Sequence, residues 1–197
     1  MTRVVLLLKD FELAKTRLSS VLDSAARRVI ATDFALAALL AVGPDALVVA
    51  GSEAAAGVAR EMGNEVIVEG RASGQNAAAR LGIESAVKGG ADAVLLLSSD
   101  LPLVDAGVVE RLLEWAGKLP RPVVVAAPAT GRGGTNALYL APPGVIDLHF
   151  GDDSLAKFEA DARGRGVRFE TYESPELALD VDEPADLAAL RERRRAG

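Results

Sequence analysis

Three acidic residues in two separate segments have the types and the spacing of a cation site. Asp100 follows an aliphatic run and precedes a Leu-Pro turn, whereas Asp180 and Asp182 lie two apart near the C-terminus. In an extended segment, side chains two positions apart point to the same side. Carboxylate oxygens are the ligands that Mg²⁺ takes in proteins, often together with water and substrate phosphates. We therefore predict that these three carboxylates form one Mg²⁺ site.

Two of these acids also have an ordinary structural interpretation. Asp182 precedes Glu183 and Pro184, which is typical of the N-cap of a helix, and this interpretation stands equal to metal binding. Asp100 is compatible with a simple turn before Pro102. The sequence leaves both alternatives open.

Three cations follow the first predicted strand. Lys9, Lys15 and Arg17 lie within nine residues of each other, directly after the aliphatic run that ends at Leu8. Ligands of parallel α/β sheets bind outside the carboxyl ends of the strands, so cations at this place suit phosphate groups. Taken alone, the segment is better explained as a solvated basic loop, but its place beside the predicted cation site favours phosphate binding.

Two glycine-rich segments are candidates for anion binding through backbone N–H groups. Residues 72–78, which include Gly74 and Asn76, open a predicted helix, and residues 131–138, which include Thr135, precede a predicted strand. Neither segment matches the dinucleotide-binding or P-loop motif. A third segment places Gly151 and Ser154 before another helix, where Ser154 would cap the helix or bind an anion.

The elements that must position these residues alternate along the chain. Short aliphatic runs alternate with longer Ala- and Leu-rich segments of helical period, which predicts an α/β fold with a mainly parallel sheet and helices on both faces. The predicted strands are 4–8, 46–50, 65–68, 93–97, 123–127, 136–140 and 167–172. The predicted helices are 24–42, 54–62, 75–88, 106–118, 154–163 and 184–194.

The composition of the chain excludes several classes of function. The chain has 197 residues, a net charge of −6, one His and no Cys, so thiolate chemistry and multi-histidine metal sites are excluded. The acidic balance argues against broad nucleic-acid binding. We find neither an apolar run of membrane-spanning length nor a signal peptide, so we expect one cytoplasmic domain over residues 1–197, compatible with a homodimer.

Taken in order, these motifs resemble one family over essentially the whole chain. That family is the guanylyltransferases of coenzyme F420 biosynthesis, called 2-phospho-L-lactate or phosphoenolpyruvate guanylyltransferases. The most specific matches are the Gly-Gly-Thr-Asn-Ala-Leu string at 133–138 and the Leu-Asp-Val-Asp-x-Pro-x-Asp-Leu ending at 179–187. The resemblance implies a Rossmann-like nucleotidyltransferase fold, similar to that of glycosyltransferases of type A.

The resemblance also implies an activity, in which GMP from GTP is joined to a small phosphorylated acid and pyrophosphate is released. The implied catalytic residues are Lys9, Lys15, Arg17 and Asp100. The implied binding residues are Lys9, Lys15 and Arg17 for the triphosphate, Gly74 and Asn76 for the guanosine, Thr135, Gly151 and Ser154 for the acceptor, and Asp100, Asp180 and Asp182 for Mg²⁺.

The acceptor acid is the least determined part of this expectation. The resemblance offers phosphoenolpyruvate, 2-phospho-L-lactate and 3-phosphoglycerate. Phe158 stands where the family often has a His, and we expect it to form an apolar wall of the acceptor pocket that disfavours the hydroxyl of phosphoglycerate. We therefore expect phosphoenolpyruvate slightly ahead of phospholactate.

Two other functions compete with this interpretation. One is a nucleotidyltransferase of the same fold that acts on a sugar phosphate or on the molybdenum cofactor. Such relatives usually carry a glycine-rich loop after the first strand, where this chain has Lys9 to Arg17. The other is a non-enzymatic, receiver-like α/β module, which would leave the three separate acids unexplained.

Overall fold

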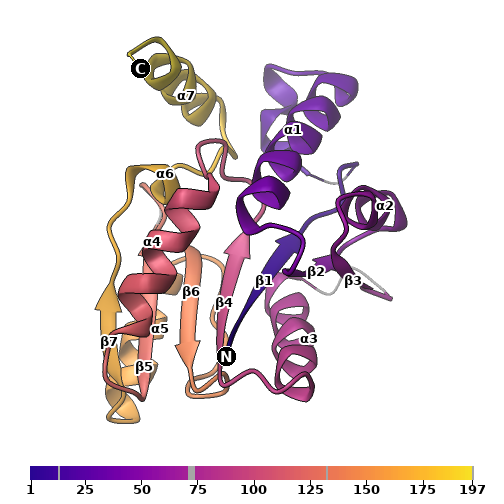
Figure 1. The fold of residues 1–197 in the computed structure, drawn as a ribbon. Coiled ribbons are helices and arrows are strands. Elements are labelled where there is room, and N and C mark those ends of the chain that lie inside the picture. Colours follow the sequence, from indigo (N-terminus) through magenta and orange to yellow (C-terminus); the bar gives the residue numbers. More distant parts are fainter. Residues whose placement is uncertain (13, 71–73, 132, 197) are drawn as a thin grey trace.

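The aliphatic runs form one seven-stranded sheet with the order β3-β2-β1-β4-β6-β5-β7 (Figure 1). The computed structural model describes residues 1–12, 14–70, 74–131 and 133–196. Residues 72, 73 and 132 of the predicted glycine-rich segments lie outside the described residues. The strands are β1 (Thr2–Leu8), β2 (Leu47–Ala50), β3 (Glu65–Val68), β4 (Ala93–Ser98), β5 (Val123–Pro128), β6 (Thr135–Ala141) and β7 (Arg168–Thr171).

Helices cover both faces of this sheet, as its aliphatic strands require. On one face α1, α2, α4 and α6 pack against alternate residues such as Leu6, Val48 and Leu95, while α3 and α5 cover the other face. The helices are α1 (Ser24–Val42), α2 (Glu53–Glu61), α3 (Gln75–Lys88), α4 (Ala106–Gly117), α5 (Ser154–Gly164), α6 (Pro175–Ala178), α7 (Pro184–Ala196) and the 3₁₀ helix η1 (Thr16–Ser20). Among the described residues, no helix is both long and apolar enough to cross a membrane.

The local sequence signals account for most element ends. The ranges of α1, α3 and β3 match the prediction at both ends, and the other predicted elements agree within two residues. The side chains of Asp23, Ser52 and Asp105 each accept a backbone N–H in the first turn of their helix. The prediction missed η1 and α6, which are one turn or slightly longer and show no hydrophobic period.

One strand departs from the parallel arrangement. β6 runs antiparallel to both of its neighbours, β4 and β5, whereas the other neighbouring pairs are parallel. Residues 129–134 are too short to contain the crossover that a parallel neighbour needs, so β5 and β6 form a hairpin. The hairpin places the start of β6 at the edge where the parallel strands end.

Packing between distant segments brings the C-terminal acids to the same edge. A small apolar cluster joins η1, α1 and the segment before α7 through Leu18, Phe34 and Val181. The backbone N–H of Val181 donates to the carbonyl of Asp100 at 3.3 Å. This contact fixes the segment that carries Asp180 and Asp182 beside the end of β4, with α7 beyond it (Figure 1).

Candidate active site

Loops from both halves of the sheet enclose a polar pocket of about 210 Å³ at the carboxyl ends of β1 and β4. We call it the polar pocket, and it contains most of the residues expected to carry the chemistry. Its lining includes Lys9, Arg17, Gln75, Ser98, Asp100, Asn136, Phe150, Asp152, Asp180, Asp182, Thr135, Gly151 and Ser154.

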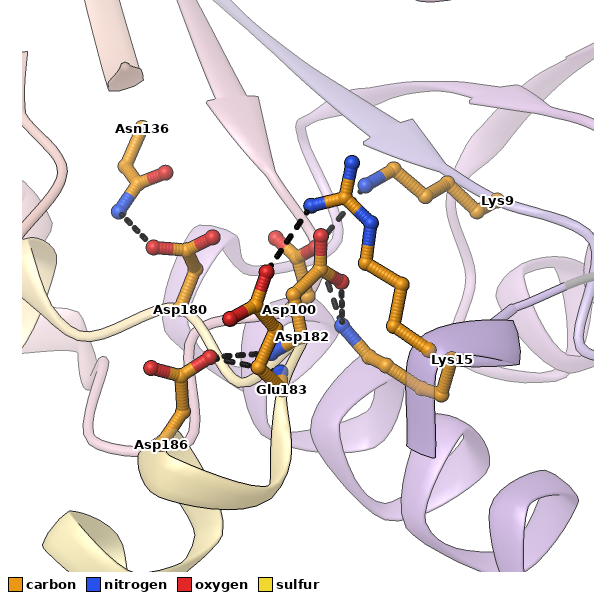
Figure 2. A network of polar contacts seen from close by, with 9 residues as sticks. Lys9, Lys15, Asp100, Asn136, Asp180, Asp182, Glu183 and Asp186 are labelled. Carbon is orange, nitrogen blue, oxygen red and sulfur yellow. Dashed lines mark hydrogen bonds and ion pairs between the residues drawn. The ribbon is translucent and has the colours of Figure 1, made fainter. Parts of the chain in front are cut away.

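Lys15 occupies the centre of the charge network beside this pocket (Figure 2). Its side chain is 3% exposed, and Nζ lies 3.1 Å from Oδ2 of Asp100 and 3.3 Å from Oδ1 of Asp182. The Lys15 backbone has φ 58°, a left-handed conformation that is uncommon for a residue other than glycine. Lys15 does not appear in the lining of the polar pocket. The structure therefore favours a role in holding the two carboxylates over the triphosphate contact predicted for Lys15.

Lys9 is the second cation on Asp100, and it faces the pocket. Its Nζ donates to Oδ2 of Asp100 at 2.9 Å, while about half of its side chain is exposed. The carboxylate of Asp100 raises the pKa of Lys9 to about 12. Burial would by itself raise the pKa of Asp100, but the ammonium groups of Lys15 and Lys9 outweigh it and hold this pKa well below its usual range. Both groups are charged at neutral pH.

Asn136 holds the third acid in place. Its Nδ2 donates to the carbonyl of Leu177 at 2.8 Å. The same group donates to Oδ1 of Asp180 at 3.3 Å (Figure 2). Asn136 lies on β6, so the antiparallel strand supplies the support for Asp180. The sequence analysis did not assign a site role to Asn136, although it stands inside the Gly-Gly-Thr-Asn-Ala-Leu string.

The contacts at the start of α7 bear on the two interpretations of Asp182. The backbone N–H groups of Asp182 and Glu183 both donate to Oδ2 of Asp186, at 2.9 and 2.7 Å. Oδ1 of Asp182 instead contacts Lys15. Asp186 thus accepts two N–H groups at the entry to α7, and the carboxylate of Asp182 contacts Lys15 and lines the polar pocket, as the metal-site prediction requires.

The three predicted metal ligands reach one pocket but do not form a closed cluster. Within the described parts of the chain, no group of three acidic or histidine side chains is arranged to hold a metal ion by itself. The ammonium of Lys15 lies between Asp100 and Asp182. The donor chemistry nevertheless fits Mg²⁺, which takes one or two carboxylates and completes its shell with substrate phosphates and water.

Two hydroxyl groups, from β6 and α5, form one wall of the polar pocket. Oγ of Ser154 donates to Oγ1 of Thr135 at 3.1 Å, and both residues are buried. Ser154 is the first residue of α5, which follows Asp153 in a left-handed conformation and Gly151 with φ 124°. The wall therefore combines hydroxyls with the N-terminus of a helix, which suits an anion.

Asn76 supports the loop that leads into this wall. Its Oδ1 accepts the backbone N–H of Phe150 at 2.8 Å, and its Nδ2 donates to the carbonyl of Phe150 at 3.0 Å. These two bonds fix the loop before Gly151 against α3. The structure favours this supporting role for Asn76 over the direct guanosine contact predicted from the sequence.

Phe158 is not a wall of the pocket, and that expectation was wrong. Its side chain is fully buried, and its ring contacts those of Phe150 and His149 with centroids 5.3 and 5.7 Å apart. It is Phe150 that lines the polar pocket, with Phe158 behind it. The expected discrimination against phosphoglycerate by Phe158 therefore loses its basis.

A second pocket of about 250 Å³ adjoins the first and shares Lys9 and Gln75 with it. We call it the apolar pocket, because aliphatic side chains from β1, β2 and α3 give it a mainly apolar surface. Gly74, predicted to lie near the guanosine, belongs to this pocket. Gln75 lines both pockets, and its Nε2 donates to Oγ of Ser98 at 3.2 Å.

This sheet, with adjoining apolar and polar pockets at its carboxyl edge, has the architecture of a nucleotidyltransferase. A solved structure of a nucleotidyl transferase from Methanothermobacter thermautotrophicus has a TM-score of 0.70 at 18% identity, covering 100% of this chain and 99% of that one. The model of the family described as "Guanylyl transferase CofC like" matches residues 2–191. The chain belongs to this family.

Curated relatives carry three different acceptor names. A phosphoenolpyruvate guanylyltransferase of Rubrobacter xylanophilus is 37% identical and covers 92% of this chain and 89% of its own length. A 3-phospho-D-glycerate guanylyltransferase of Colwellia psychrerythraea is 32% identical over 96% of this chain and 90% of its own. A 2-phospho-L-lactate guanylyltransferase of M. thermautotrophicus is 40% identical over half of this chain and 42% of its own.

Proposed function

We propose that this protein transfers GMP from GTP to the phosphate of a three-carbon acid. One phosphate oxygen of the acceptor attacks the α-phosphorus of GTP, the bond from that phosphorus to the bridging oxygen breaks, and pyrophosphate leaves. The observation that carries the proposal is the polar pocket, in which Lys9 and Arg17 share one space with four carboxylates and three hydroxyl side chains. Membership of the CofC-like family supports the guanylyl donor.

This reaction does not require a general base. The second pKa of a phosphate monoester is about 6, so the attacking oxygen already carries negative charge at neutral pH. The rate enhancement then comes from alignment and from neutralising the charge of two anions that must approach each other. The single His of the chain, His149, contacts Asp161 at 3.0 Å and does not appear in the lining of the polar pocket.

The residues divide into two sets that face each other. Lys9 and Arg17 bring positive charge to the triphosphate, and Lys15 keeps Asp100 and Asp182 in place. Thr135, Ser154 and the backbone at Gly151 bind the acceptor from the opposite wall. Both sets line one pocket, so the acceptor phosphate is held close to the α-phosphate.

A divalent cation, which we take to be Mg²⁺, completes the charge balance. Asp100, Asp180 and Asp182 are the residues that would hold it, and it would supply Lewis-acid polarisation of the phosphate. Because these carboxylates do not form a closed cluster by themselves, we expect the cation to bind together with the nucleotide.

Phosphoenolpyruvate is the acceptor that we propose first. It shares a carboxylate next to the phosphate-bearing carbon with 2-phospho-L-lactate, and the hydroxyl wall suits either anion. The relative from R. xylanophilus, which is named for phosphoenolpyruvate, supports this order. We place the reaction in coenzyme F420 biosynthesis in the cytoplasm, as the family resemblance implies.

The test is pyrophosphate release from GTP with each of the three acids at equal concentration. We expect release with phosphoenolpyruvate or 2-phospho-L-lactate, and none when EDTA removes the divalent cation. A clear preference for 3-phosphoglycerate would contradict phosphoenolpyruvate as the acceptor and identify 3-phosphoglycerate instead. Release with a sugar phosphate alone, or with none of these acceptors, would contradict the proposed function.

A further inference from the structure

The apolar pocket has a composition that differs sharply from that of the polar pocket. It lies outside the carboxyl ends of β1, β2 and β3, and its lining includes Leu7, Val49 and Ala78. Its charged residues among those described are Lys9, Asp10 and Glu69. The pocket therefore combines an aliphatic surface with two carboxylates.

The close approach of two loops forms one side of this pocket. The N–H of Gly51 donates to the carbonyl of Leu8 at 2.8 Å. A Cβ built on Gly51 would come within 3.0 Å of the backbone nitrogen of Asp10. With glycine at this position, the backbone after β2 lies directly against the loop after β1.

The linings of the two pockets suit different parts of GTP. The apolar pocket offers mainly aliphatic surface, whereas the polar pocket offers Arg17 and the hydroxyl groups of Thr135 and Ser154 to phosphate groups. A base is uncharged, has large apolar faces and offers N–H groups at its edge. Because Lys9 and Gln75 belong to both pockets, a nucleotide with its phosphates in the polar pocket reaches the apolar pocket with its base.

Two carboxylates are candidates for contact with the edge of the base. Oδ1 of Asp10 already accepts the backbone N–H of Glu12 at 2.9 Å, a contact within its own loop. Glu69 follows β3, and its N–H donates to the carbonyl of Ala50 at 2.9 Å, so its backbone continues the pairing of β3 with β2. The backbone of Glu69 is thus held by the sheet, whereas Asp10 lies in the loop after β1.

We propose that Glu69 selects guanine by accepting hydrogen bonds from its N1–H and its 2-amino group. This inference rests on the proposed function, because it concerns the donor nucleotide of that reaction. A carboxylate has two acceptor oxygens and matches two adjacent N–H donors, in the way that it matches the fork of an arginine. Adenine has an unprotonated N1 at the same edge, which a carboxylate repels.

The substitution Glu69→Gln tests this proposal, because it should change the preferred nucleotide from GTP to XTP. Gln replaces one acceptor with an N–H donor, which opposes the 2-amino group of guanine but matches the 2-carbonyl of xanthine. We expect kcat/KM for GTP to fall about tenfold to hundredfold and kcat/KM for XTP to rise above that for GTP. Pyrophosphate release with GTP, XTP, ITP and ATP measures these values, with a fixed concentration of acceptor.

Two further variants make the result specific. Glu65→Gln makes the same chemical change at the other end of β3, where Glu65 is exposed and pairs with Arg3, and we expect it to keep the preference for GTP. Asp10→Asn tests the other carboxylate of the pocket. An unchanged preference for GTP in Glu69→Gln, or an exchange to XTP in Asp10→Asn instead, would overturn the assignment of Glu69. A wild-type protein that uses ATP or CTP in preference to GTP would contradict the proposed function itself.

Discussion

At the scale of single residues, the main electrostatic feature of this site is a lysine ammonium that lies between two carboxylates. Lys15 is almost completely buried, and its two partners are separated from it by 85 and 167 positions in the chain. A buried charge that loses its partner is costly, so the three groups depend on one another. This arrangement fixes Asp100 and Asp182 before any substrate binds, which is the kind of preorganisation that stabilises charged transition states.

Replacing Lys15 tests whether it holds the carboxylates or binds substrate. We expect Lys15→Met to lower the free energy of unfolding by about 3 kcal/mol, because Asp100 and Asp182 lose a buried cation. Urea denaturation measures this change.

Lys9→Met is the matched control, because Lys9 contacts the same oxygen of Asp100 but is half exposed. We expect it to cost less than about 1 kcal/mol of stability while kcat/KM for GTP falls at least about tenfold. If Lys15→Met retained wild-type stability and lost only GTP binding, Lys15 would be a substrate contact, as the sequence analysis had it.

At the scale of elements, the acceptor wall depends on how one loop is tied to two helices. Asn76 on α3 binds the backbone of Phe150, and the ring of Phe150 packs on Phe158 of α5. Gly151 and Ser154 follow directly in the chain. The geometry of the wall is therefore set in part by Asn76 and Phe158, which do not themselves line the polar pocket.

The substitution Asn76→Ala separates the supporting role from the guanosine contact. Loss of both bonds to Phe150 should loosen the loop, so we expect KM for the acceptor to rise at least about tenfold, while KM for GTP changes less than about twofold. Steady-state kinetics with each substrate varied in turn gives both values. A rise in KM for GTP alone would restore Asn76 as a nucleotide contact.

For the molecule as a whole, the charge network links stability to pH. The pKa of Asp100 lies below its value of about 3.9 in the unfolded chain, so the unfolded state binds more protons as the pH falls. The contribution of Asp100 to the free energy of unfolding is fully present above its unfolded-state pKa. This contribution is lost as the pH decreases toward the lower pKa of the folded state.

We therefore compare the wild type with Asp100→Asn, which lacks this titration. The difference in unfolding free energy should be constant above about pH 5 and should shrink below about pH 4. Urea denaturation at a series of pH values measures it. A difference that is independent of pH would show that folding does not lower the pKa of Asp100.

The sequence by itself determined where the helices and strands lie and which types of residue follow each strand. Helix period, caps such as Asp23 and Ser52, and aliphatic runs act over a few residues, so their signals are complete in a short window. The same local signals placed Lys9 and Asp100 just after strands and Asp182 just before a helix. The short connection 129–134 also contains the signal for an antiparallel β6, because a parallel neighbour would need a longer crossover.

Only the tertiary structure decided which of these residues meet and what each one does. The burial of Lys15 against Asp100 and Asp182, the pairing of Asn136 with Asp180, and the position of Phe158 behind Phe150 all join segments that are distant in the chain or packed through the core. Such contacts depend on sheet order and on helix packing, and neither is encoded in the spacing of a motif. A basic residue in a loop can thus be a substrate contact or a buried counterion, and the fold distinguishes the two.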